Sequence, residues 1–295
     1  MELIRTVDAM QAHADAARAD GQTLALVPTL GALHDGHLAI VRRALEAADH
    51  VTVSVFVNPT QFGPGEDYDT YPRDLGGDRE TLRALDVDTL FAPLVEEMYP
   101  YSDDEALPGP LAWVDMVRLD EHLCGAHRED HFRGVTTVVT KLFHACKPDV
   151  AVFGEKDAQQ YVILQRLAED LLFDIDIVGV PTVREPDGLA QSSRNEYLDP
   201  DEREQATVLY EAVTAAEEAI EGGEQAAEAV VGAMENALAA APDADVQYAE
   251  LVDAHTLQPV DHLAPGQEVL AAVAVFFGDT RLIDNTFVQV PASPS

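Results

Sequence analysis

Two histidines three residues apart, His34 and His37, are the first residues along the chain whose types and spacing suggest chemistry. They follow an apolar run, residues 24–27, and a Gly-containing loop that begins at Pro28. A phosphate chain at the start of the next helix would meet free backbone N–H groups, the positive end of the helix dipole and both imidazoles. Taken alone, such a pair is more commonly two incidental histidines at a capped helix start, so other motifs must decide between the two interpretations.

Two more polar stretches have phosphate-binding character, GEKD at residues 154–157 and QSSRN at residues 191–195. Lys156, one of only three lysines, follows a predicted strand and precedes a predicted helix, where a triphosphate needs a point charge. Two hydroxyls and a guanidinium at residues 192–194 could close over phosphates and stabilise charge on a leaving group. Each stretch alone resembles an ordinary turn. Together with the histidines they contain no nucleophile and base pair, which indicates phosphate chemistry by positioning and electrostatics.

Alternating strands and helices must position these residues. The apolar pattern predicts strands at 24–27, 51–57, 89–92, 150–153 and 175–178, and helices at 38–48, 75–85, 133–146 and 158–171. This order predicts an α/β fold with a doubly wound, Rossmann-like parallel sheet whose ligands bind at the carboxyl ends of the strands. Asn58, the GEKD turn and the loop before His34 all fall at that edge. The loop at 61–74 is long and predicts a lid, and an irregular stretch precedes Pro110.

The chain changes character after Pro181. No lysine or arginine occurs at residues 204–280, and the pattern predicts two Ala/Glu-rich helices, 201–220 and 224–240, followed by strands at 246–252 and 269–277. We therefore predict a nucleotide-binding domain at residues 1–180 and a smaller α+β domain at residues 181–295 that carries the Ser-Ser-Arg loop.

The charge balance excludes several classes of partner. The 295 residues include 18 Lys plus Arg against 54 Asp plus Glu, a formal net charge of -36, which disfavours binding to nucleic acids and to anionic membranes. Cys124 and Cys146 are too few for a disulfide framework or a four-ligand zinc site. No apolar stretch approaches the roughly 20 residues of a membrane span, and the first residues lack signal-peptide features, so we expect a cytoplasmic protein.

Seven motifs in order carry a resemblance: PTLGALHDGH, FVNPTQF, YPRD, HFRGV, FGEKDAQQ, DGLAQSSRNEYL and TRLIDN. They resemble the successive motifs of the pantothenate synthetases, the pantoate–β-alanine ligases of the HxGH nucleotidyltransferase superfamily, from about Pro28 to Asn285. The resemblance implies that pantoate attacks the α-phosphate of ATP to give pantoyl adenylate and pyrophosphate. The β-alanine amine then attacks the acyl carbon and releases AMP. It also implies a homodimer, and pantoate binding in the first domain.

Residue roles follow from the same resemblance, motif by motif. Catalysis would involve His37, His34, Lys156, Ser192, Ser193 and Arg194. The same residues would bind ATP together with Leu30, Gly31, Ala32, Leu33, Asp35, Gly36, Gly154, Glu155, Asp157, Val183 and Gln191. Pantoate would be bound by Gln61, Gln160, Asn58 and Arg128, the last near the phosphate side, and β-alanine by Gln61. No side chain would bind a metal directly, because Mg²⁺ would arrive on the ATP phosphates.

Three departures from the family pattern are Leu30, where many members have methionine, Gln191, where they have leucine or methionine, and Cys124, where some have glutamate. We interpret Cys124 as a small buried residue, since adenylate chemistry needs no covalent enzyme intermediate. Other functions remain open at this point. Another nucleotidyltransferase of the superfamily would need more basic residues, an aminoacyl-tRNA synthetase is disfavoured by the charge, and a regulatory protein would not need the phosphate-binding set.

The dispersed acids and scarce lysines predict a protein adapted to high salt, in which self-repulsion is screened. The free energy of unfolding should therefore rise between low and molar KCl. Denaturant titrations at a series of KCl concentrations measure it, and a flat or falling dependence would remove the halophile hypothesis.

Overall fold

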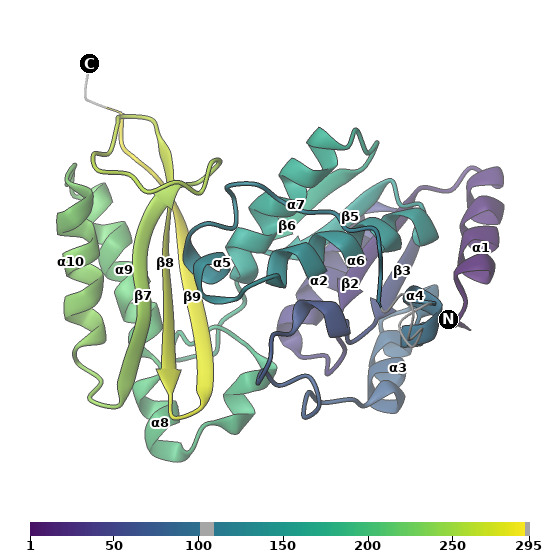
Figure 1. The fold of residues 1–295 in the computed structure, drawn as a ribbon, viewed down its shortest axis with the longest axis horizontal. Helices are drawn as coiled ribbons and strands as arrows, with labels where there is room; N and C mark the ends of the chain where they lie inside the picture. Colours follow the sequence, from purple (N-terminus) through teal and green to yellow (C-terminus); the bar gives the residue numbers. More distant parts are fainter. Residues whose placement is uncertain (101–108, 293–295) are drawn as a thin grey trace. The chain divides into compact units, whose positions relative to one another are not determined.

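The chain forms two compact units, and the computed structural model describes residues 1–100 and 109–292 (Figure 1). The first unit contains Met1–Met116, Arg128–Glu155 and Ile163–Pro181, and the second contains Val117–His127, Lys156–Val162 and Thr182–Ser295. Two short segments thus belong to the second unit although they precede residue 181. The predicted domains, 1–180 and 181–295, stay a prediction. The irregular stretch predicted before Pro110 lies partly outside the described residues.

A parallel sheet forms the centre of the first unit, which confirms the predicted fold class. In the described residues its six strands lie in the order β1 (Glu2–Ile4), β4 (Thr89–Phe91), β3 (His50–Val55), β2 (Leu24–Thr29), β5 (Val150–Gly154) and β6 (Asp176–Val180). All pairings between neighbours are parallel. The helices are α1 (Val7–Ala19), α2 (Asp35–Ala47), α3 (Leu75–Ala84), α4 (Val95–Met98), α6 (His131–Cys146) and α7 (Ala158–Asp170), which continues from the second unit into the first.

The strand order reverses next to β2. From β2 the chain proceeds outward through β3 and β4, and it later returns to place β5 on the other side of β2. Such a reversal is a topological switch point, and in open α/β sheets ligands bind at the carboxyl ends of the strands beside it. The loop that leads to His34 leaves β2 there, and the GEKD turn leaves β5 there.

Strand β2 is buried on both faces, as a central parallel strand must be. Ala25 and Val27 cluster with Val41 of α2, while Leu26, which alternation places on the opposite face, is fully buried. We predicted that the run ends at Pro28, but the strand continues to Thr29. A proline is tolerated because β5 pairs with β2 only at residues 25 and 26, so the missing N–H is not needed on that side.

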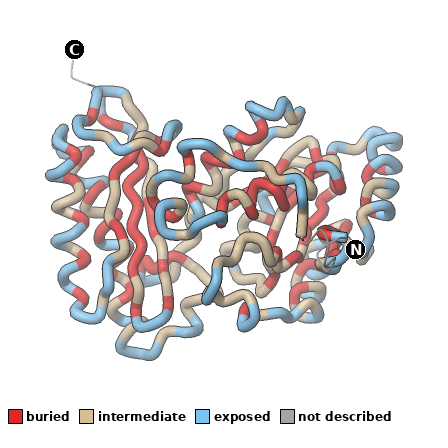
Figure 2. Tube along the Cα trace, in the orientation of Figure 1, coloured by how far each residue is buried: buried red, intermediate tan, exposed pale blue. Residues whose placement is uncertain are grey.

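The second unit is an antiparallel sheet with helices against it, the expected α+β arrangement. Its strands are β7 (Ala244–Asp253), β8 (Glu268–Phe277) and β9 (Thr280–Gln289), in that order, and its helices include α5 (Leu123–His127), α8 (Pro200–Gln205), α9 (Val208–Glu221) and α10 (Ala227–Leu238). Helices α9 and α10 pack together beside the sheet, and Figure 2 shows that β8 is buried along almost its whole length.

Several elements differ from their predictions. The helix predicted at 201–220 is two helices, because Thr207 lies at the break and its hydroxyl donates to the Glu204 carbonyl at 3.0 Å, a local bond that competes with helical pairing. Elements β1, α1 and β9 were not predicted. The alternation in β9 is masked by a buried carboxylate, Asp284, among its inward-facing residues.

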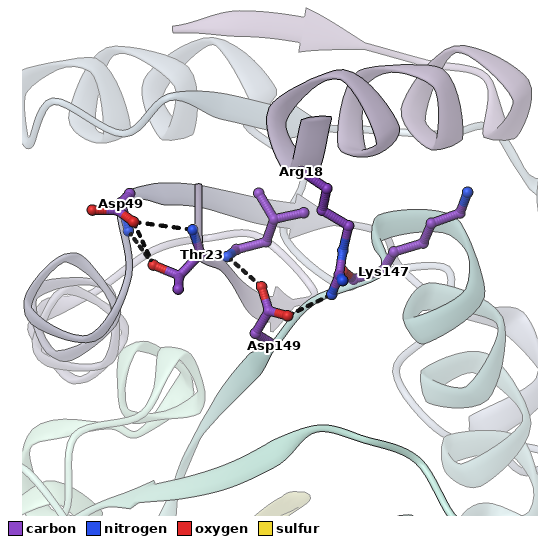
Figure 3. A network of polar contacts seen from close by, with 6 residues as sticks. Arg18, Thr23, Asp49, Lys147 and Asp149 are labelled. Carbon is purple, nitrogen blue, oxygen red and sulfur yellow. Dashed lines mark hydrogen bonds and ion pairs between the residues drawn. The ribbon is translucent and has the colours of Figure 1, made fainter. Parts of the chain in front are cut away.

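Polar contacts at the amino-terminal edge of the parallel sheet hold β2, β5 and α1 together (Figure 3). The Asp49 carboxylate accepts from the Thr23 N–H at 3.0 Å and the Thr23 hydroxyl at 2.7 Å. The Asp149 carboxylate accepts from the Leu24 N–H at 2.8 Å and from Arg18 Nη2 at 2.6 Å. The backbone and side-chain hydrogen bonds from Thr23 lower the pKa of Asp49, so its carboxylate is ionised over the physiological range.

The Asp149 contact allows a stability test. Asp149→Ala removes the acceptor of a backbone N–H and the partner of Arg18, so the free energy of unfolding should fall by about 1–2 kcal/mol. Chemical denaturation measures it. Asp170→Ala is the control, because it removes only an exposed helical pair with Arg166 and should cost less than about 0.5 kcal/mol. Equal losses in both variants would contradict the assigned role of Asp149.

Candidate functional site

The loop between β2 and α2 is held in a single shape. Gly31 has φ 88° and Ala32 has φ 52°, and a side chain at Gly31 would lie 2.9 Å from Asp78 Oδ2 and 3.0 Å from Val55 Cγ1. Glycine is therefore required at residue 31, both for its backbone conformation and for space.

Asp78 of α3 supports this loop from behind. Its carboxylate is buried and accepts the backbone N–H groups of Leu33 at 2.9 Å and Ala32 at 3.2 Å. Burial raises the pKa of Asp78 and outweighs the two N–H donors, which lower it. Residue 78 was missed at the sequence level. It lies in the predicted helix, and nothing in the local pattern distinguishes a buried acid there from an exposed one.

His34 and His37 form a reciprocal cap at the start of α2. The Nδ1 atom of His34 accepts from the Gly36 N–H at 3.2 Å, and Nδ1 of His37 accepts from the His34 N–H at 3.3 Å. The ring centroids lie 4.1 Å apart. Because each Nδ1 is an acceptor, a neutral ring carries its proton on Nε2. The pair thus adds two side-chain N–H donors to the backbone donors of the helix N-terminus, a combination suited to phosphate oxygens.

Asn58 and Gln61 follow β3 at the same edge of the sheet. Asn58 is fully buried, and its Nδ2 donates to Gln61 Oε1 at 3.1 Å and to the Gly134 carbonyl at 3.2 Å. Its Oδ1 accepts from the Tyr99 hydroxyl at 2.8 Å and from the Thr60 hydroxyl at 3.0 Å. The protein therefore uses both ends of the Asn58 amide, and one of these bonds sets the orientation of Gln61.

Arg128 anchors the long loop at residues 61–74. It donates to both carboxylate oxygens of Glu66, with Nε and Nη2 each 2.7 Å away, and its Nη1 lies 3.0 Å from His131 Nε2. His131 Nδ1 in turn lies 2.7 Å from the Gln61 carbonyl oxygen. Burial raises the pKa of Glu66, but the hydrogen bonds and charge of Arg128 lower it more, so the net shift is downward. Within the first unit, the structure thus links Arg128, Gln61 and Asn58 by hydrogen bonds.

The second unit holds most of the remaining predicted residues, whereas Gly154 and Glu155 belong to the first. Lys156 lies in the 3-10 turn Glu155–Asp157, and its carbonyl accepts from Asn285 Nδ2 at 2.7 Å. Ser192 caps the 3-10 helix Ser193–Tyr197, since its Oγ accepts from the Arg194 N–H at 3.2 Å. A bridge between Arg184 and Ala190 closes the base of this loop.

Two other residues considered in the sequence, Gln160 and Cys124, also lie in this unit. Gln160 lies in the first turn of α7, half-buried, and its neighbour Gln159 is buried and donates to the Leu119 and His122 carbonyls. Cys124 is a buried free thiol, as interpreted from the sequence, and its Sγ lies 3.3 Å from Arg281 Nη2.

Two kinds of feature are absent from the described residues. Among residues 1–100 and 109–292, no group of three or more His, Cys, Asp or Glu side chains could hold a metal ion. No helix in that part of the chain is both long and apolar enough to cross a membrane.

A six-stranded parallel sheet with a helix N-terminus at its switch point is the architecture of α/β nucleotide-binding enzymes. The family model described as "Pantoate-beta-alanine ligase" matches residues 2–287. The chain belongs to the pantoate–β-alanine ligase family.

Individual relatives agree with this assignment. A pantothenate synthetase from Salinibacter ruber is 90% identical over 291 residues, covering 99% of each chain. A crystal structure of the pantothenate synthetase from Thermus thermophilus has a TM-score of 0.88 at 45% identity and covers 99% of this chain and 100% of that one. The ligase from Francisella tularensis, solved as a complex with "Beta-gamma ATP and Beta-alanine", has a TM-score of 0.76 at 31% identity over 97% of each chain.

The Glu66–Arg128 pair predicts a pH dependence. Because the pKa of Glu66 is lowered on folding, the pair stabilises the protein above the ordinary value of 4.5, and this stability is lost as pH falls through the lowered pKa. Glu66→Gln should cost about 1 kcal/mol at pH 7 and progressively less below about pH 4.5. Unfolding free energies of both proteins from pH 3 to 7 measure the difference, and a difference independent of pH would refute the linkage.

The hydrogen bonds to Asp78 predict how its substitution changes the free energy of unfolding. Asp78→Ala leaves two buried backbone N–H groups without their acceptor, so the free energy of unfolding should fall by about 2 kcal/mol or more. Asp78→Asn keeps an acceptor oxygen and should cost less. Denaturant titration of both variants ranks them, and equal losses would show that the loop depends on the charge of Asp78 rather than on its acceptor oxygens.

Proposed function

We propose that this chain's residues carry out the ATP-dependent condensation of pantoate with β-alanine by binding the substrates and stabilising phosphate charge. Supporting the proposal is the reciprocal His34 and His37 cap, which places two imidazole donors at a helix N-terminus beside the switch point of the sheet. A ligase that passes through an adenylate needs donors for phosphate oxygens and no enzyme nucleophile. The described site residues supply such donors.

In the first step, a pantoate carboxylate oxygen forms a bond to the α-phosphorus of ATP as the bond to the bridging oxygen of pyrophosphate breaks. Negative charge grows on the α-phosphate oxygens and on the leaving group. We assign the neutral imidazoles of His34 and His37 to phosphate oxygens as Nε2–H donors, because Nδ1 of each ring accepts a backbone N–H in the cap. The ammonium of Lys156 and the guanidinium of Arg194 neutralise phosphate charge, and the hydroxyls of Ser192 and Ser193 donate to it.

In the second step, the β-alanine amine attacks the acyl carbon of pantoyl adenylate, the bond to the phosphate oxygen breaks, and AMP leaves. The amine loses a proton as the amide forms. The same donors then stabilise the departing AMP phosphate. No residue becomes covalently attached to an intermediate, in keeping with the burial of Cys124.

Pantoate and β-alanine would be recognised by amides. We assign Gln61 to pantoate and β-alanine and Gln160 to pantoate, because amides both donate and accept and can bind hydroxyls and carboxylates without adding charge. For Asn58 and Arg128 the contacts support an indirect role. Asn58 orients the Gln61 side chain, and Arg128 anchors the loop that carries it.

Several further properties belong to the proposal. The ATP site would include the other loop residues Leu30, Gly31, Ala32, Leu33, Asp35, Gly36, Gly154, Glu155, Asp157, Val183 and Gln191. Mg²⁺ would enter bound to the phosphate oxygens of ATP, and it would neutralise part of the phosphate charge. We also propose a cytoplasmic homodimer adapted to high salt, supported by the family resemblance and by the dispersed acidic charge.

One assay tests the reaction. Purified protein with ATP, Mg²⁺, pantoate and β-alanine should release AMP and pyrophosphate in equal amounts, and AMP release should depend on β-alanine. AMP release that is independent of β-alanine would favour a transferase, and the absence of pyrophosphate would overturn the proposed reaction.

His37 provides the sharpest test of the site. His37→Ala should slow adenylate formation by about 100-fold or more, the scale of losing one stabiliser of transition-state charge. Pyrophosphate release in a single turnover measures this step. His255→Ala, at an exposed histidine of the second unit, is the control and should leave the rate unchanged. Near wild-type turnover of the His37 variant would remove this residue from the mechanism.

A further inference from the structure

The TRLIDN motif places two adjacent buried polar residues, Asp284 and Asn285, in the middle of strand β9. They are 1% and 7% exposed, unusually low for a carboxylate and an amide. Successive residues of a strand point to opposite faces of a sheet. Asp284 shares its face with Leu282 and Val288, which belong to the core formed with α9 and α10, so Asn285 lies on the other face.

Asp284 holds the base of the Ser192–Arg194 loop. Its two oxygens accept from Arg184, with Nη1 at 2.6 Å and Nη2 at 3.0 Å, and Nη1 also donates to the Gly188 carbonyl at 3.0 Å. The guanidinium stacks over the Tyr210 ring of α9, 4.5 Å from its centroid. A two-pronged ion pair of this kind fixes both the distance and the plane of the arginine.

Hydrogen bonds within the loop connect Arg184 to the segment that carries the serines. Arg184 is bridged to Ala190, and the Gln191 N–H donates to the Val183 carbonyl at 2.9 Å. On the far side of the bridge, Asn195 Nδ2 donates to the Ala190 carbonyl at 3.1 Å. Hydrogen bonds thus connect the residues on both sides of 192–194 to the bridge between Arg184 and Ala190.

Asn285 holds the other phosphate-binding segment. Its Nδ2 donates to the carbonyl of Lys156 at 2.7 Å, which fixes the backbone from which the lysine side chain extends. The Asn285 backbone N–H donates to Asp284 Oδ1 at 2.8 Å, so the two residues are also joined to each other.

We propose that Asp284 and Asn285 are positioning residues that set, from opposite faces of one strand, the Ser192–Arg194 loop and the Lys156 turn against the β- and γ-phosphates of ATP. The inference rests on the proposed phosphate-binding role of those two segments. It gives the TRLIDN motif a function in nucleotide binding although neither residue touches the nucleotide.

The test compares a nucleotide that has the outer phosphates with one that lacks them. Dissociation constants for an ATP analogue with a methylene bridge between the β- and γ-phosphates, and for AMP, are measured by calorimetry on wild-type protein and on Asn285→Ala. Loss of one positioning hydrogen bond should weaken the ATP analogue by about tenfold and AMP by less than about twofold. A merely structural defect would weaken both nucleotides alike, and that result, or an unchanged affinity for the analogue, would overturn the proposal.

Val288→Ala is the matched control, because it removes buried volume from the same strand without touching either segment. It should lower the unfolding temperature and leave the ratio of the two affinities unchanged. A ratio that changes as much in this control as in Asn285→Ala would contradict the proposal.

Asp284→Asn, which keeps the size of the side chain but not its charge, should produce the same split between the two nucleotides. If that variant does not fold, Arg184→Lys tests the same link by removing the two-pronged geometry while keeping the charge. In the full reaction, the active variants should show a raised KM for ATP and unchanged KM values for pantoate and β-alanine. A wild-type protein that releases no AMP would refute the proposed reaction, whereas an active wild type with no split in the variants would refute only the positioning role.

Discussion

The first unit depends on the parallel pairing of β2 with neighbours on both sides. Because β3 lies on one side and β5 on the other, the chain must leave β2 and β5 at the same edge while proceeding in opposite directions across the sheet. Everything assigned to phosphate binding in this unit follows from that constraint. The loop before α2 begins where β2 ends, and its shape is then completed by a glycine with positive φ and by the buried carboxylate of Asp78.

A second level of support lies behind the residues that would contact substrates. Asn58 orients Gln61, Arg128 anchors the loop that follows it, and the Asp284 and Asn285 pair holds two segments of the other unit. Each of these supports is buried or half-buried, so its hydrogen bonds are shielded from competing water and define one geometry. Lys156, Arg194 and the two glutamines proposed to meet the substrates have long, flexible side chains, and such chains act with precision only when their backbones are fixed.

Much of this could be predicted from the sequence, and the exceptions have physical causes. The apolar runs at 24–27 and 150–153 could be predicted as strands because a strand buried on both faces needs uninterrupted apolar residues, and both runs are short and bounded by Gly or Pro. Most site residues were assigned through the resemblance to a family, and Lys156 was also distinguished by the scarcity of lysine in this chain. Asp78 and Asp284 were missed because a buried acid looks like a surface acid until its partners are known, and those partners are far away in the sequence. Helix α1 was missed because its buried face is largely alanine, which gives a weak apolar signal.

The acidic side chains at the amino-terminal edge of the sheet do more than make the net charge negative, because they also accept hydrogen bonds from the backbone. Asp49 accepts from the backbone and hydroxyl of Thr23, Asp149 accepts from the Leu24 N–H, and in the second unit Asp253 accepts the N–H groups of His255 and Thr256. In these contacts the carboxylate meets a dipole at hydrogen-bond distance rather than a distant cation. Dissolved ions weaken forces between separated charges far more than they weaken such short contacts. Contacts between a carboxylate and a backbone N–H therefore depend less on the salt concentration than exposed pairs of opposite charge do.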